Sequence, residues 1–219
     1  MGRVESEGRA VIIINAEQRS PEWYAARLGK LTASCLGDAF AQTKSGWSTS
    51  RRNLRLRLVL ERLTGRSQES GYTNAAMERG TILEPDARAA YEVESGLLVE
   101  SVGFVLHDEL PTGASPDGLI GDDGGLEVKC PGAAAHLDYL KGAIPNDYRL
   151  QVIHSLWLTG RAWWDFASFN PDFPEPLRLK VTRLYAKGID LAAHELAVRF
   201  FLTEVENELA EVQRLMVAA

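Results

Sequence analysis

Hydrophobic residues recur along the chain with two different periods, and each period predicts one kind of element. Spacings of three and four residues predict helices, which we expect at about 51–63, 73–95, 133–141, 147–159 and 190–216. Alternating or short continuous apolar runs predict strands, which we expect at 10–15, 98–104, 114–120, 126–130, 162–170 and 177–186. Helices, then strands, then further helices indicate an α/β domain whose central mixed β-sheet is flanked by helices.

Capping and turn residues mark where other elements begin. Ser20 is a good helix N-cap and Pro21 suits the first helical position, so we expect a helix to open there. Thr32-Ala33-Ser34 predicts a cap or turn before another helix that ends near Phe40. Residues 43–50 are polar and predict a loop, and the glycine and aspartate run at 121–125 predicts a tight hairpin turn.

Length and composition fit a single domain over residues 1–219 that ends in an amphipathic helix at about 190–216. Of the 219 residues, 45% are hydrophobic, which is enough for one core. The chain has no run of about 18 apolar residues and no evident secretory signal, so we expect a cytoplasmic protein without a membrane partner. Cys35 and Cys130 lie far apart in the sequence, and we expect free thiols because two cysteines cannot form a four-cysteine metal site.

The distribution of charge matters more for a polyanionic partner than the net charge of −6. Seven basic residues and one acid lie between Lys44 and Arg66, whereas the last thirty residues are rich in glutamate. The basic stretch has two interpretations, a surface that contacts nucleic acid and an ordinary solvated helix face. Trp47 lies in the polar loop beside it and is a candidate DNA contact.

The predicted hairpin brings three ionisable side chains together. Side chains two positions apart on a strand share a face, so Glu127 and Lys129 point the same way while Leu126 and Val128 point into apolar packing. The turn at 121–125 returns the chain so that Asp117 lies beside Glu127. We therefore predict two carboxylates and an ammonium at one edge of the sheet.

Two neighbouring carboxylates repel each other unless a cation binds or one of them takes up a proton. Mg²⁺ prefers oxygen ligands, usually one or two carboxylates together with substrate phosphate. A lysine on the same face can orient or deprotonate a water molecule and offset charge on a phosphate. The alternative is a surface hairpin with a cross-strand Glu–Lys pair, and these residues alone leave both interpretations open.

The residues around this hairpin resemble a known family. Pro116-Asp117 followed by Glu127-Val128-Lys129 resembles the PD-(D/E)xK nuclease signature. Further blocks are similar to the lambda exonuclease or YqaJ-type viral recombinase family, and they occur in the family's order: WYAARLGKLTAS at 23–34, GTILEPDA at 80–87, SPDGL at 115–119, LEVKCP at 126–131, and the tyrosine, glutamine and tryptophan motifs of 148–171. The resemblance implies a restriction-endonuclease-like core.

The resemblance also implies roles for individual residues. Asp117 and Glu127, assisted by the carbonyl of Val128, would bind one or two Mg²⁺ ions, and Mn²⁺ would substitute. Lys129 would position the attacking water. The other implied site residues are Glu84 as a third carboxylate, Gln151 near the metal ions, and Arg27 with Ser34 in a pocket for a terminal 5′ phosphate. Two positions depart from the family pattern: Pro85 follows Glu84 and predicts a kink or restart of the helix, and Ile153 stands where a second glutamine is expected.

The function implied by the resemblance is a 5′→3′ exonuclease that degrades one strand of linear double-stranded DNA to mononucleotides in phage-type recombination. Its implied assembly is a toroidal homotrimer around DNA, with a single-strand annealing protein as partner and the basic stretch 44–66 facing DNA. The alternatives are an endonuclease with the same core and a non-catalytic module that binds DNA ends. His136 and His154 fit none of the motifs, and we expect packing or exposed roles for both.

Overall fold

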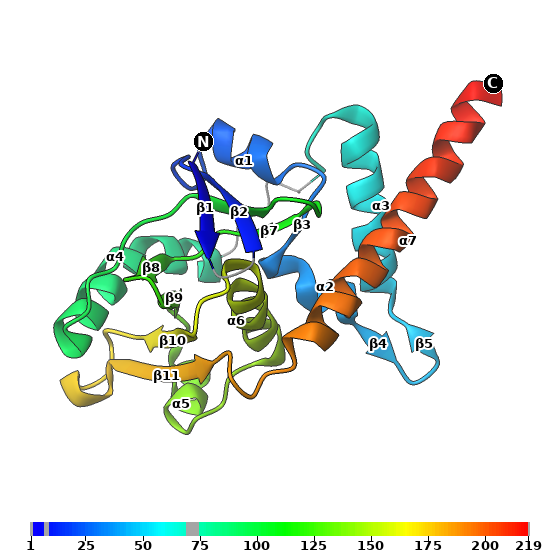
Figure 1. Ribbon diagram of the computed structural model, residues 1–219. Coiled ribbons are helices and arrows are strands. Elements are labelled where there is room, and N and C mark those ends of the chain that lie inside the picture. The colour runs from blue at the N-terminus through cyan, green and yellow to red at the C-terminus, as the bar shows by residue number, and fades with distance from the viewer. Residues whose placement is uncertain (1, 7–8, 69–74, 219) are drawn as a thin grey trace.

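The strands in the described part of the chain, residues 2–6, 9–68 and 75–218, form two sheets and a small hairpin in the computed structural model (Figure 1). The first sheet has the order β1 (Gly2–Ser6), β2 (Arg9–Ile14), β6 (Phe104–His107), β7 (Thr112–Ala114) and β3 (Leu31–Thr32). The second has the order β11 (Leu179–Tyr185), β10 (Trp163–Phe169), β9 (Gly124–Lys129) and β8 (Gly118–Ile120). The hairpin pairs β4 (Gln42–Thr43) with β5 (Gly46–Trp47).

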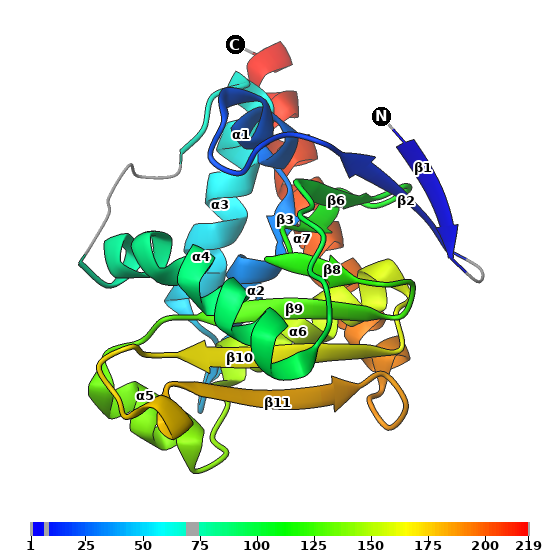
Figure 2. The same cartoon turned by 90° about the vertical axis from the view of Figure 1, so that its left-hand side faces the viewer.

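The second sheet is mixed, because β9 and β10 run parallel whereas β8 pairs with β9, and β10 with β11, in the antiparallel direction. Helix α4 (Ala75–Ser95) covers one face of this sheet, and α6 (Asn146–Thr159) covers the other (Figure 2). Leu126 and Val128 of β9 pack in the cluster that contains Tyr91 of α4, as the alternation along the strand predicts. The opposite face carries a second cluster, in which Leu156 of α6 meets Phe166 of β10.

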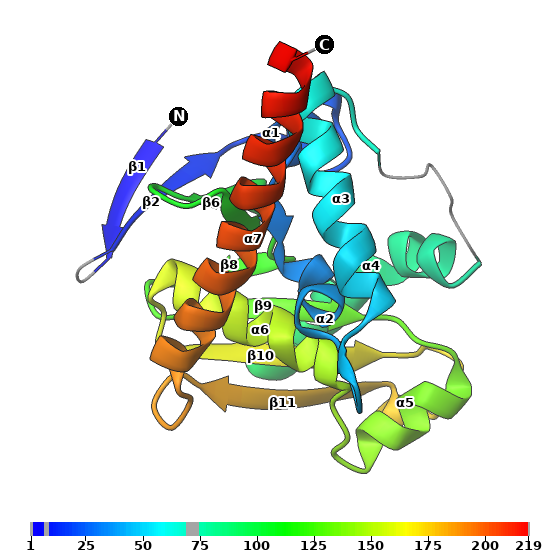
Figure 3. The same cartoon turned by 90° about the vertical axis from the view of Figure 1, so that its right-hand side faces the viewer.

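The remaining helices are α1 (Pro21–Arg27), α2 (Leu36–Phe40), α3 (Thr49–Thr64), α5 (Ala133–Leu140) and α7 (Leu191–Ala218), with 3₁₀ turns at Ala33–Cys35 and Glu175–Leu177. A third cluster joins α3, α6 and α7 to the first sheet, and α3 and α7 lie side by side (Figure 3). The cap at Ser20 is confirmed, since its Oγ accepts a hydrogen bond from the Trp23 N–H (3.2 Å). No helix within the described residues has both the length and the apolar character needed to cross a membrane.

Three expectations about elements need correction. The strand expected from Leu98 begins as a regular strand only at Phe104, after an isolated bridge between Glu100 and Leu119. The expected strand at 114–120 is two strands in different sheets, because Pro116 lacks the N–H that a continuing ladder needs. The polar loop at 43–50 contains the β4–β5 hairpin and the start of α3. The predicted start of the 73–95 helix, residues 73 and 74, lies outside the described residues.

Candidate active site

The hairpin of β8 and β9 holds Asp117 against the middle of β9. The strands pair with Gly118 opposite Leu126, and the turn uses Gly121 at φ 49°, a conformation that favours glycine. Asp117 lies directly before β8, and its Oδ2 accepts a hydrogen bond from the Val128 N–H (2.6 Å). The prediction that the hairpin returns Asp117 to the neighbourhood of Glu127 is confirmed.

Glu127 and Lys129 form a close ion pair, with 2.5 Å between Glu127 Oε1 and Lys129 Nζ. Glu127 is only 1% exposed, and the ammonium of Lys129 also lies 4.9 Å from the ring centre of Tyr148. A cross-strand pair on a surface hairpin would leave both side chains in solvent. The burial of Glu127 therefore contradicts that simpler interpretation.

Burial dominates the electrostatics of this cluster. It raises the pKa of Asp117, and it raises the pKa of Glu127 to about 8 although the Lys129 ammonium opposes the shift. Burial raises the pKa of Lys129's neighbour Glu84 as well, with a further contribution from the charge of Asp117. Burial would lower the pKa of Lys129, but the Glu127 and Asp117 carboxylates outweigh it and raise this pKa above its usual range. The site thus holds more buried carboxylate than one ammonium neutralises.

This excess of negative charge fits a divalent cation with hard oxygen ligands. Asp117, Glu127 and the carbonyl of Val128 are the groups that could hold it, with Glu84 at the side. Within the described residues, no group of three or more His, Cys, Asp or Glu side chains is arranged to hold a metal ion. An ion at this site would need water or phosphate oxygens to complete its coordination, which is the usual situation for Mg²⁺.

Glu84 lies in the middle of α4, and its carboxylate faces the hairpin. It lines the same cavity as Asp117 and Lys129 and lies 3.8 Å from Arg19 Nη2. The helix does not restart at Pro85, because α4 runs as one helix from Ala75 to Ser95 with Pro85 inside it. The structure therefore brings Glu84 to the site in spite of the proline.

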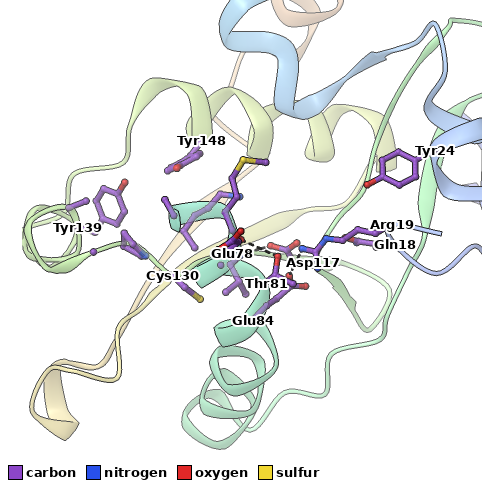
Figure 4. Close-up of a pocket in the computed structure, with 18 residues that line it drawn as sticks. Gln18, Arg19, Tyr24, Glu78, Thr81, Glu84, Asp117, Cys130, Tyr139 and Tyr148 are labelled. Atoms are coloured by element: carbon purple, nitrogen blue, oxygen red, sulfur yellow. Dashed lines mark hydrogen bonds and ion pairs between the residues drawn. The ribbon is translucent and has the colours of Figure 1, made fainter. Parts of the chain in front are cut away.

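A cavity of about 780 Å³ opens over this cluster (Figure 4). Val128 and Lys129 of β9, and Cys130 directly after it, contribute to its wall. Its other walls come from α4, from α5 and α6, and from α1 with the segment before it, through Met77, Thr81, Tyr139, Tyr148, Tyr24, Gln18 and Arg19. Such a cleft, with ionisable groups at its base, is the expected form of an active site.

Gln151, Arg27 and Ser34, which are also predicted site residues, do not line this cavity. Gln151 is partly buried on α6, one turn after Tyr148. Arg27 stacks on Trp23, with its guanidinium carbon 4.0 Å from the ring centre, and donates to Ser115 Oγ (3.3 Å). Ser34 is exposed after β3, and its Oγ lies 3.2 Å from Thr32 Oγ1. The roles of all three stay predictions.

Gln18 and Arg19 line the cavity although the sequence gives no signal for either residue. Both lie in the short connection between β2 and α1, where no periodic pattern and no motif singles them out. Gln18 Nε2 donates to the carbonyl of Pro116 (3.0 Å), directly before Asp117. Only the fold places this connection beside the hairpin, about a hundred residues later in the sequence.

Three of the seven basic residues in the stretch 44–66 pair with glutamates of α7: Arg51 with Glu204, Arg55 with Glu204 and Glu208, and Arg62 with Glu206. That this stretch faces DNA stays a prediction. Trp47 stacks on Arg51, with the guanidinium carbon 3.9 Å from its ring centre, and is 49% exposed. The acidic residues of α7 thus neutralise much of the basic stretch.

His136 and His154 have packing roles, as expected. Both are fully buried, and His136 bonds to Ser168 Oγ (2.8 Å) and to the carbonyl of Leu177 (2.8 Å). His154 lies 3.1 Å from Thr112 Oγ1 and 3.0 Å from His194 Nε2. Trp157 and Trp164 are also fully buried in the core.

Comparison with known proteins identifies relatives of this arrangement. The family model of the YqaJ-like viral recombinase domain matches residues 22–162. Crystal structures of the alkaline exonuclease LHK-Exo from Laribacter hongkongensis, one of them in complex with dAMP, are 40% identical with a TM-score of 0.82, covering 91% of this chain and 99% of that chain. We found no match among curated protein sequences.

A phage related exonuclease from Haemophilus somnus 129PT has the same fold at lower similarity. It is 13% identical, with a TM-score of 0.65, and the match covers 85% of this chain and 96% of that chain. The structural matches confirm the expected α/β fold with a restriction-endonuclease-like core. The family match confirms the resemblance on which the sequence-based predictions depended.

Proposed function

The chain belongs to the family of YqaJ-like viral recombinase domains, and from that membership and the geometry of the hairpin we propose that it is a Mg²⁺-dependent exonuclease. Its proposed substrate is linear double-stranded DNA, of which it degrades one strand in the 5′→3′ direction to mononucleotides. The observation that carries this proposal is the cluster of Asp117, Glu127 and Lys129, in which Glu127 is buried and the other two line an open cavity. The exonucleases among its structural relatives support the reaction class.

In the proposed reaction, Asp117 and Glu127 with the Val128 carbonyl hold the metal ion, and Mn²⁺ substitutes for Mg²⁺. A bound divalent ion supplies positive charge against the charge that develops on the phosphate. Lys129 Nζ, fixed by Glu127 and resting over the Tyr148 ring, holds the attacking water and donates toward the phosphate. Glu84 adds a carboxylate at the side of the site.

The proposed direction of digestion depends on Arg27 and Ser34, because the hydrolytic centre itself serves either strand direction. Arginine binds phosphate through two parallel N–H donors. Arg27 already contacts Ser115, two residues before Asp117, so an anion bound to it would lie close to the catalytic strand. We propose that Arg27 and Ser34 help to hold the strand end that carries a 5′ phosphate, and that Gln151 acts near the metal ions.

The proposed context is homologous recombination by single-strand annealing in a phage-type pathway. The resemblance supports a ring of three copies around DNA and a single-strand annealing protein as partner. Leu196, Phe200 and Leu215 of α7 are more than half exposed, and they are available for a contact with another protein.

The proposed direction and mode of digestion can be tested on four matched DNA substrates: linear duplexes with a 5′ phosphate, with a 5′ hydroxyl, with a labelled 3′ end, and a closed circle. We expect Mg²⁺-dependent release of mononucleotides from the linear duplexes, faster with the 5′ phosphate, and no cleavage of the circle. Efficient cutting of the circle would favour the endonuclease alternative. Equal rates with either 5′ end would remove the proposed roles of Arg27 and Ser34.

A further inference from the structure

Arg19 has a backbone conformation that arginine rarely adopts. Its φ is +72°, and no other described residue apart from glycines has a positive φ. The Ser20 N–H donates to the carbonyl of Glu17 (3.0 Å), so residues 17–20 form a tight turn with Arg19 at the third position, where a positive φ favours glycine. An arginine here opposes folding, and such outliers concentrate at functional sites.

The turn that contains Arg19 is fixed next to the catalytic hairpin. Gln18, its second residue, donates from Nε2 to the carbonyl of Pro116 (3.0 Å). Ser20, its last residue, caps α1 through the Trp23 N–H, and Trp23 Nε1 in turn donates to Ser115 Oγ (2.9 Å). The turn therefore holds Arg19 at a set distance from Asp117.

The side chain of Arg19, labelled in Figure 4, belongs to the walls of two cavities. The cavity of about 780 Å³ over the hairpin and a second one of about 490 Å³ share Gln18, Arg19, Glu84 and Asp117 in their walls. The described residues that line the larger cavity include two bases, Arg19 and Lys129. Lys129 is committed to Glu127 and is 24% exposed, whereas the Arg19 side chain is 52% exposed.

The ion pair with Glu84 does not explain why an arginine occupies this unfavourable backbone position. Its shortest distance is 3.8 Å, and the side chains of Arg19 and Glu84 are 52% and 28% exposed. Ion pairs of this length and exposure contribute little to stability. They are also easily exchanged for another anion, and arginine offers a phosphate two parallel donors that lysine cannot match.

We propose that Arg19 binds a phosphate group of the DNA strand that lies at the Asp117–Glu127 centre. This inference rests on the proposed nuclease function, because it takes its ligand from the DNA substrate. The carboxylates of the cavity repel a polyanion, and Arg19 supplies the accessible positive charge that draws one phosphate against them. In the absence of DNA the guanidinium is kept close by Glu84, and on binding it transfers to the phosphate.

The variant Arg19→Gly tests this role, because glycine suits the backbone conformation of the turn and should leave the fold intact. We expect unchanged or higher thermal stability, and a fall in kcat/KM on linear duplex DNA of about 10- to 100-fold, the usual effect of losing a charged hydrogen bond. The kcat/KM of Arg19→Lys should lie between those of the wild type and Arg19→Gly. Arg214→Gln, which removes the same charge from the exposed end of α7, is the control and should keep the wild-type kcat/KM.

Two outcomes of this comparison would overturn the inference. Equal kcat/KM for Arg19→Gly and the wild type would show that the guanidinium does not contact the substrate. Parallel losses of thermal stability and activity would show that Arg19 only supports the fold. A wild-type protein that digests no DNA would overturn the proposed function first, so the two failures are distinguishable.

A second measurement identifies the phosphate. DNA binding is measured with Ca²⁺ in place of Mg²⁺ on duplexes in which one phosphate at a time near the end is an uncharged methylphosphonate. At the phosphate that Arg19 contacts, the methylphosphonate should weaken DNA binding by the wild type. It should not weaken binding by Arg19→Gly any further, because that contact is already absent. Equal losses in both proteins at every position would contradict the contact.

Discussion

Asp117 is the residue at which stability and proposed function oppose each other most directly. Its carboxylate is buried, which raises its pKa, and only the Val128 N–H and more distant cations compensate its charge. Buried charge of this kind destabilises a protein until a partner neutralises it. The metal ion of the proposed mechanism would be such a partner.

The variant Asp117→Asn should therefore raise the melting temperature of the metal-free protein at pH 8. A gain of about 1–2 kcal/mol corresponds to about 2–8 °C for a chain of this size. The rise in melting temperature on adding Mg²⁺ should disappear, because the ligand is lost. Both effects are measured by thermal denaturation with and without Mg²⁺.

Asp165 provides the control, because it is a buried aspartate that already has partners for its charge. Arg183 binds it through two nitrogens at 2.8 Å, and Tyr91 donates to it at 2.7 Å. Asp165→Asn should lower the melting temperature and leave the response to Mg²⁺ in place. An Asp117→Asn variant that is less stable without metal, or that still responds to Mg²⁺, would remove Asp117 from the metal site.

At the scale of elements, α3 and α7 are joined by ion pairs of very different burial. Arg51 is 2% exposed and binds Glu204 through Nε and Nη2, at 3.2 and 2.9 Å. Arg62 binds Glu206 at 2.6 Å, but Glu206 is 56% exposed. The energy of an ion pair depends strongly on this difference, because water screens the exposed pair.

We predict that Glu204→Gln destabilises the protein by about 3–5 kcal/mol, since it leaves the buried guanidinium of Arg51 without its counter-charge. Glu206→Gln should cost less than about 1 kcal/mol. Urea denaturation of the two variants measures both values. Equal effects would show that Arg51 is not buried against α7 as described.

A hydrogen-bonded histidine chain joins α7 to α6 and β7. Burial lowers the pKa of His194 to about 4 and that of His154 well below its usual value. In the unfolded chain both histidines bind a proton near pH 6.5, whereas in the folded protein they bind one only at lower pH. The free energy of unfolding is therefore highest above pH 6.5 with respect to these groups. It falls as the pH falls toward 4, by about 3 kcal/mol for His194.

The variant His194→Gln should show this effect as a pH-dependent difference from the wild type. The comparison is needed because the raised pKa values of Asp117 and Glu127 act in the opposite direction over part of the range. We expect the difference in unfolding free energy between the two proteins to narrow as the pH falls from 7 to 4.5. A constant difference would mean that His194 takes up its proton equally in both states.

At the scale of the whole molecule, local patterns predicted most elements but not how they meet. Caps, turns and periodicity located the helices after Ser20 and at 133–141, 147–159 and 190–216, and also the strands of the catalytic hairpin. The division of 114–120 between two sheets depended on long-range pairing around Pro116. The neutralisation of Arg51 by Glu204 depended on the packing of helices 150 residues apart in sequence.

The candidate site also has features that the local sequence could predict and features that depend on the fold. The spacing of Asp117, Glu127 and Lys129 along one hairpin is local, so the sequence could place them together. Glu127 lies on the face of β9 opposite Leu126 and Val128, and its burial, which excludes a surface ion pair, depends on tertiary packing that the hairpin's own sequence does not specify. Arg19 approaches from a connection near the N-terminus, and only its backbone conformation in the fold makes it conspicuous.

The most direct test of the central claim is the rate at which the wild type and Lys129→Ala release mononucleotides from a linear duplex as Mg²⁺ is titrated. We expect no release without Mg²⁺, saturable release by the wild type, and a rate about 10²- to 10⁴-fold lower for Lys129→Ala. Its melting temperature should still rise with Mg²⁺, because Asp117 and Glu127 remain. Undiminished Mg²⁺-dependent digestion by Lys129→Ala would show that the catalytic centre lies elsewhere.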